Sequence, residues 1–80
     1  MKKIIVISKP NCGACMLVKN LFDNEEIPYE SINGVDNLDI VVAYDVMSFP
    51  VTILLDENGE ELDRITGYDP VALSWMGLQV

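Results

Sequence analysis

The sequence of 80 residues contains no histidine, a single tryptophan and only two cysteines, Cys12 and Cys15. Without histidine, one chain cannot build a Ser-His-Asp triad, a Cys-His nucleophile pair or a mixed Cys/His zinc site. Two thiolates also fall short of the four ligands that a structural zinc ion requires. The two cysteines, separated by two residues, are therefore the main candidates for chemistry.

Basic residues are scarce as well: 5 Lys and Arg face 13 Asp and Glu, for a net charge of −8. This charge repels nucleic acid and anionic membrane surfaces, so we expect neither as a main partner. The apolar run Ile4–Ile7 stops at Ser8. It is shorter than the roughly 7–15 apolar residues of a signal peptide, and shorter still than a membrane-spanning helix. We therefore expect a cytosolic protein, in which a close cysteine pair is more often catalytic or metal-binding than structural.

Half of the residues are apolar, and the mean hydropathy is +0.25. This composition indicates a folded chain. We expect one small domain spanning residues 1–80, since no linker, repeat or low-complexity tract interrupts the sequence.

Hydrophobic periodicity and turn residues predict an α/β chain with seven elements. In the first helix, residues 14, 17, 18, 21 and 22 form the predicted apolar stripe. The predicted elements are a strand at 3–7, a helix from 14 to 23 or 25, a strand at 28–32, a helix capped by Asp36 or Asn37, a strand at 52–55, a turn at 56–59, a strand at 60–66 and a helix that starts at Pro70 after an Asp69 cap.

The order of the elements also predicts their pairing. A strand, a helix and a strand in succession favour a parallel pair joined by a right-handed crossover. The last two strands should form a hairpin, because Asn58-Gly59 supplies the positive φ angles that tight turns need. In the second helix we expect Leu38, Val41 and Val42 to share the buried face, and in the last helix we expect Trp75 to pack.

The cysteine pair falls where a strand gives way to a helix. The first amides of a helix are unpaired and its dipole is positive there, so a Cys12 thiolate should accept hydrogen bonds from amides near Ala14 and Cys15. We therefore expect the pKa of Cys12 to lie below that of a free thiol, with Lys9 adding a positive charge nearby. Gly13 has no side chain and lets a partner approach closely.

Cys15 lies one helical turn beyond Cys12, on a stripe that is apolar, and should be less exposed. This arrangement suits dithiol exchange, in which Cys12 attacks a target disulfide and Cys15 then releases the reduced target. A passive disulfide is the alternative, although so short a loop would constrain the unfolded chain little. Pro50, at the entrance to a strand, is either a simple strand-starting proline or a cis-proline that faces the cysteines.

Taken together, these segments make the chain resemble the thioredoxin–glutaredoxin superfamily along nearly its whole length. The resemblance implies a thioredoxin-like fold with the order βαβαββα and a mixed four-stranded sheet flanked by helices. The matching segments are Lys3–Ile7, Cys12-Gly13-Ala14-Cys15, Phe49-Pro50 with Val51–Leu55, Asn58-Gly59-Glu60, and Gly67.

The resemblance also implies roles for individual residues. Cys12 would be the nucleophile and Cys15 the resolving thiol of a thiol–disulfide oxidoreductase, with no cofactor and no metal. Pro50 would be the family's cis-proline, and the backbone of Phe49 would pair with an extended substrate segment. The substrate-binding residues would be Gly13, Ala14, Phe49, Pro50 and Gly67.

The small size of the chain and the segment Thr66–Pro70 are similar to the glutaredoxin-like electron donors of bacterial ribonucleotide reductase, which thioredoxin reductase recharges. We therefore expect a monomer that takes electrons from thioredoxin reductase. The chain departs from thioredoxins at Val6, where they carry a buried aspartate, at Asn11, where they carry tryptophan, and at Ala14, where they carry proline.

Two alternatives remain. A glutathione-dependent glutaredoxin is one, since Lys9 matches one glutathione ligand, although the usual Gly-Gly pair is reduced to Gly67. A Cu(I) metallochaperone is the other, because thiolates suit Cu(I) and such proteins also place CxxC between a strand and a helix. Their element order differs from this one, and Pro10 stands where they carry a methionine.

Overall fold

Seven elements follow one another in the computed structural model, which describes residues 1–80, and their order is the predicted one. The largest shift in a boundary is at the second strand, which begins at Glu30 instead of residue 28. The elements are β1 (Lys3–Ser8), α1 (Gly13–Asn24), β2 (Glu30–Asn33), α2 (Leu38–Ala43), β3 (Val51–Leu55), β4 (Glu61–Thr66) and α3 (Pro70–Gly77).

The four strands form one mixed sheet in the order β2-β1-β3-β4. β1 pairs in parallel with β2, and β3 pairs antiparallel with β4, as the order of the elements predicted. β3 also pairs antiparallel with β1, a pairing that the element order did not predict. The ends of β1, β2 and β4 and the start of β3 therefore meet along one edge of the sheet. We call it the Ser8 edge; it is formed by Ser8, Asn33, Val51 and Thr66.

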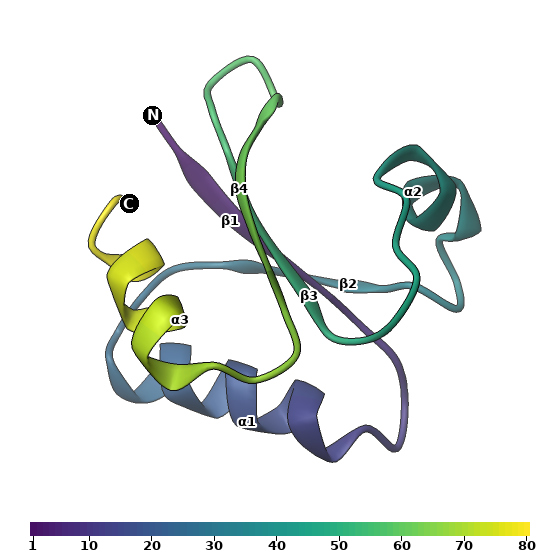
Figure 1. Ribbon diagram of the computed structural model, residues 1–80, viewed down its shortest axis with the longest axis horizontal. Coiled ribbons are helices and arrows are strands. Elements are labelled where there is room, and N and C mark those ends of the chain that lie inside the picture. Colours follow the sequence, from purple (N-terminus) through teal and green to yellow (C-terminus); the bar gives the residue numbers. More distant parts are fainter.

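Helices cover both faces of the sheet, with α1 and α3 together on one face and α2 on the other (Figure 1). Side chains alternate along each strand, so every central strand contributes to two cores. No helix combines the length and the apolar character needed to span a membrane. The core on the α1 face contains Ile4, Val6, Val18, Phe22, Leu54, Leu73 and Met76, and the core on the α2 face contains Ile5, Ile7, Val46, Val51, Ile53 and Leu55.

Two predicted helix faces are wrong in detail. In α1, Cys15, Val18 and Phe22 are the buried residues, whereas Leu17 is half exposed. In α2, Val41 packs against the core beside Ile40, whereas Leu38 and Val42 are exposed. Both segments are apolar on more than one side, and a surface helix buries only one stripe, so the tertiary contact selects which side is covered.

The last helix begins as predicted, because the Asp69 carboxylate accepts a hydrogen bond from the amide of Ala72 at 3.2 Å. Leu73 and Met76 are buried, but the prediction that Trp75 packs is wrong: its side chain is 67% exposed. It precedes Met76 by one residue and therefore lies on a different side of the helix.

The hairpin between β3 and β4 turns at Gly59, which has φ +82°. Asn58 does not share this conformation, so only one of the two predicted positive φ angles is present. The Asp56 carboxylate accepts hydrogen bonds from the amides of Asn58 and Glu60 at 2.8 and 2.9 Å and thereby closes the turn.

Arg64 ties β4 to the end of α2. Its guanidinium donates to the Tyr44 carbonyl at 2.6 Å and to both carboxylate oxygens of Glu61 at 2.7 and 2.9 Å. The hydrogen bonds from Arg64 hold the pKa of Glu61 below its ordinary value. With six residues, α2 is a short helix, and its position therefore depends on this hydrogen bond at its carboxyl end.

We expect Arg64→Ala to lower the free energy of unfolding at pH 7 by about 1–2 kcal/mol, mostly through the lost bond to the Tyr44 carbonyl. Because the folded pKa of Glu61 is depressed, the ion-pair part is present above the unfolded pKa and is lost as the pH falls through the folded pKa. Urea denaturation at pH 7 and in acid should therefore show a smaller difference from wild type in acid.

Lys3→Ala is the matched control, since the Lys3–Glu30 pair is more than half exposed on both sides (56% and 55%). We expect it to change stability by less than about 0.5 kcal/mol. An equal loss in the two variants would contradict the structural role of Arg64.

Candidate active site

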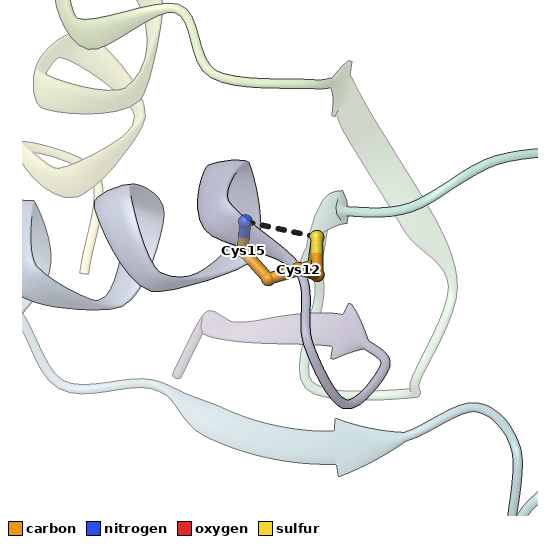
Figure 2. Close-up of a disulfide and its surroundings, with 2 residues drawn as sticks. All are labelled: Cys12 and Cys15. Atoms are coloured by element: carbon orange, nitrogen blue, oxygen red, sulfur yellow. Dashed lines mark hydrogen bonds between the residues drawn. A yellow bond between two sulfur atoms is a disulfide. The ribbon is translucent and has the colours of Figure 1, made fainter.

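Cys12 is the N-cap residue of α1, placed there by the loop that leaves the Ser8 edge. Its backbone is extended (φ −119°, ψ 107°), and its Sγ accepts a hydrogen bond from the amide of Cys15 at 3.2 Å (Figure 2). Asn11 turns the chain into the helix with φ +56°, a left-handed conformation that asparagine tolerates better than most residues. The predicted amide donor at Cys15 is thus present.

The two cysteines are joined as a disulfide with a Cα–Cα distance of 5.2 Å. Cys15 is 2% exposed and Cys12 is half-buried, which is the difference that helical spacing predicted. Cys12 is therefore the more accessible residue of the pair, and Cys15 is buried on the inner side of α1.

Pro50 reaches the same edge from the neighbouring strand, since it directly precedes β3. The register pairs Ile7, near the end of β1, with Val51, the first residue of β3, so Pro50 adjoins the cysteine loop. Pro50 is fully buried, and the peptide bond before it is cis. Its carbonyl accepts a hydrogen bond from the amide of Gly67 at 2.9 Å, which fixes the loop after β4 against it.

Phe49 lies over Gly34, the residue that directly follows β2. A Cβ on Gly34 would overlap the Phe49 ring and would lie 3.1 Å from Cγ2 of Val41. The amide of Gly34 donates to the Ser8 carbonyl at 2.8 Å, which brings its backbone to the edge of the sheet. A glycine directly after a strand is the signal that could have indicated such a close approach.

Lys9 lies beside the ring of Phe49. Its Nζ lies 6.0 Å from the centroid of the Phe49 ring, at the outer limit of a cation–π contact. The positive charge that the sequence placed beside the thiol is therefore held over the neighbouring aromatic ring.

The predicted substrate-binding residues lie in the segments that adjoin the Ser8 edge: the first turn of α1, the loop before β3 and the loop after β4. Gly13 is exposed and Ala14 half-buried at the start of α1, and Phe49 and Pro50 precede β3. Gly67 follows β4 with φ +81°, a conformation that favours glycine. The arrangement leaves one accessible sulfur surrounded by backbone and small or apolar side chains.

Two known proteins resemble this chain in sequence. No protein-family model matches the chain. The SPbeta prophage-derived thioredoxin-like protein YosR of Bacillus subtilis is 34% identical over 68 residues, which cover 85% of each chain. The thioredoxin of Mycoplasma genitalium is 34% identical over 64 residues, which cover 74% of this chain and 62% of that protein.

Solved structures share the fold at lower identity. Oxidised mitochondrial thioredoxin 3 of Saccharomyces cerevisiae matches with a TM-score of 0.84 and 20% identity, over 99% of this chain and 78% of that one. The thioredoxin of Malassezia sympodialis matches with a TM-score of 0.83 and 18% identity, over 98% and 73%. At these identities the likeness establishes the fold.

The sheet, the three helices and the cysteine pair at a helix start, together with the 34% identity to a thioredoxin-like protein, define a small redox protein of the thioredoxin/glutaredoxin superfamily. The chain belongs to the thioredoxin-like family and is a thiol–disulfide oxidoreductase. The resemblance stated from the sequence and the predicted fold class are confirmed.

We expect Gly67→Ala to destabilise the protein by about 1–2 kcal/mol, because alanine must adopt φ near +81° although its Cβ would meet open space. Gly13→Ala is the control: its Cβ also meets open space, but the backbone is helical, so stability should hold or rise by up to about 1 kcal/mol. Urea denaturation of the oxidised proteins measures both changes, and equal losses would argue against strain at Gly67.

Proposed function

We propose that this protein reduces disulfide bonds in other proteins with the Cys12–Cys15 dithiol and is recharged by thioredoxin reductase. The observation that carries the proposal is the unequal pair at the start of α1, with a half-buried Cys12 that accepts an amide hydrogen bond and a buried Cys15 one turn later. The thioredoxin named among its relatives supports the choice of reductase.

The reaction begins with the reduced pair. The Cys12 thiolate, favoured by the helix N-terminus, attacks one sulfur of the target disulfide, and the other target sulfur leaves as a thiolate. A mixed disulfide then joins Cys12 to the target. Cys15 attacks Cys12, the second target sulfur leaves, and the Cys12–Cys15 disulfide forms. Two electrons have passed to the target, and the reductase restores them.

The backbone of Phe49 supports the proposed substrate groove. Its amide and carbonyl take part in no internal hydrogen bond, whereas the neighbouring Pro50 carbonyl is already bonded to the amide of Gly67. An extended segment of the target can therefore pair with Phe49 while its disulfide faces Cys12. Gly13, Ala14 and Gly67 would line the path without bulky side chains.

We also propose a target, a compartment and an oligomeric state for this protein. Ribonucleotide reductase is the target that we propose from the Thr66–Pro70 segment, and the cytosol is the compartment in which a dithiol of this kind stays reduced. We propose a monomer, since the groove needs no second copy. Glutathione is the competing reductant, with Lys9 as its ligand.

We expect Cys12→Ser to abolish disulfide reduction, because the accessible nucleophile is lost. Cys15→Ser should instead attack a target disulfide once and stop as a stable mixed disulfide, because the resolving thiol is absent. Mass spectrometry of each variant after mixing with insulin distinguishes the two. Substantial turnover by Cys12→Ser, or release of target by Cys15→Ser without an adduct, would overturn the assigned roles.

The recharging partner is tested by following NADPH consumption with a protein disulfide as substrate in two parallel systems. One contains thioredoxin reductase, and the other contains glutathione and glutathione reductase. Turnover in the first system is the expected result. Turnover only in the second would make the protein a glutaredoxin, and Lys9→Ala should then lower that rate.

Failure of both systems, with reductases from a matching species, would reject the electron-donor function. The Cu(I) hypothesis would then gain support from a tight stoichiometric Cu(I) complex that blocks alkylation of Cys12.

A further inference from the structure

Thr52 carries a hydroxyl with no partner. The residue is fully buried in β3, and its Oγ1 is the one buried side-chain nitrogen or oxygen that makes no hydrogen bond. Native proteins contain few such groups, and each one calls for an explanation such as a role in catalysis or redox chemistry. The neighbours of this hydroxyl are therefore informative.

Strand alternation directs Thr52 toward α1. Leu54, two residues later, belongs to the core on the α1 face, and Pro50, two residues earlier, adjoins the cysteine loop. The cross-strand partners of Thr52 are Val6 on β1 and Ile65 on β4, both packed on the α1 face. Neither partner has a polar side chain, so the sheet offers Thr52 no hydrogen bond.

Cys15 faces the same layer from the helix. It forms one buried stripe with Val18 and Phe22, which pack in the core that contains Val6 and Leu54. α1 starts at the Ser8 edge and runs back beneath the sheet (Figure 1), so Cys15 is the member of the stripe nearest that edge. Thr52, the second residue of β3, lies at the same end of the layer.

The proposed reaction needs a charged Cys15 in this apolar layer. A buried thiol loses its proton reluctantly, because a thiolate there is poorly solvated. Along α1 the ionisable groups nearest to Cys15 are Cys12, its disulfide partner, and Lys19, one turn further on. β1 adds none at Val6, where thioredoxins carry an aspartate.

We propose that the Thr52 hydroxyl donates a hydrogen bond to Cys15 Sγ while that sulfur attacks the mixed disulfide. The inference rests on the proposed role of Cys15 as the resolving thiol. In the step, the Cys15 sulfur bonds to the Cys12 sulfur, the bond between Cys12 and the target breaks, and the target leaves as a thiolate that takes up a proton from water. The Cys15 proton goes to water, and Thr52 keeps its own.

The Thr52 hydroxyl should lower the stability of the oxidised protein, but it should assist the reaction of the reduced one. In the disulfide form, the Cys15 sulfur is neutral, and Thr52 remains buried without a partner. In the dithiol and mixed-disulfide forms, a thiolate at Cys15 gives it an acceptor. Removal of the hydroxyl should therefore stabilise the oxidised protein while it slows the release of the target.

The test replaces the hydroxyl by a methyl group of similar shape with Thr52→Val, and Thr52→Ser retains the hydroxyl. In a Cys12→Ser background, the thiolate absorbance of Cys15 is followed against pH. We expect Thr52→Val to raise the pKa of Cys15 by about one unit and Thr52→Ser to leave it close to wild type. Full chains with both cysteines should release insulin from the mixed disulfide about tenfold more slowly at neutral pH with Thr52→Val, and the difference should shrink at alkaline pH.

Two control variants separate this effect from others. Thr66→Val makes the same chemical change at an exposed position of β4 and should leave the Cys15 titration unchanged. Ser8→Ala removes the hydroxyl of the other buried polar residue, at 4% exposure, and should also have little effect. Three results would each overturn the proposal. They are a lower melting temperature of the oxidised Thr52→Val protein, a wild-type titration of Cys15 in that variant, and a shift of the Cys15 titration by Ser8→Ala.

Failure of this inference is distinguishable from failure of the proposed function. If the wild-type chain releases no target, the reductase function fails, but the Cys15 titration still reports whether Thr52 stabilises the thiolate. If the wild-type chain turns over and Thr52→Val matches it at every pH, the role of Thr52 alone is rejected.

Discussion

The antiparallel pairing of β1 with β3 is the constraint on which the rest of the site depends. The Ile7–Val51 register brings the end of one strand beside the start of the other, so two loops that are far apart in the sequence leave the sheet at one edge. One loop leads to Cys12 at the start of α1, and the other contains Pro50. A slip of one residue would turn the apolar side chains of β3 to the opposite faces, and the two cores prevent it.

Different elements supply different parts of the chemistry. The helix start provides amides for the accessible sulfur at Cys12, and the sheet face beneath α1 buries Cys15. The loop before β3 leaves the Phe49 backbone unpaired, and its side chain is seated on Gly34. Such division keeps the reactive groups on rigid supports while the surface around them stays open to a partner.

Most of the acidic residues lie away from this edge. Acidic residues crowd the hairpin between β3 and β4 and the end of α1, at the opposite side of the sheet, in a chain of net charge −8. Close to the cysteines stands the cation Lys9, held over Phe49. Asp36, Asp39 and Asp69 follow the segments that leave the Ser8 edge, so this end is acidic as well, but less so.

The sequence by itself determined the order of the elements, the fold family and the cysteine pair, because these depend on local patterns: β-branched runs, turn residues, the Asp69 cap and the CxxC spacing. Tertiary structure decided which face each helix buries, as the exposed Val42 and Trp75 show, since an apolar residue is covered only where a neighbour lies. It also decided which residues from distant segments meet, such as Gly34 beneath Phe49 and Val6 beside Thr52. Strand register and helix docking create these neighbours, and no local pattern encodes a contact between segments until the sheet has brought them together.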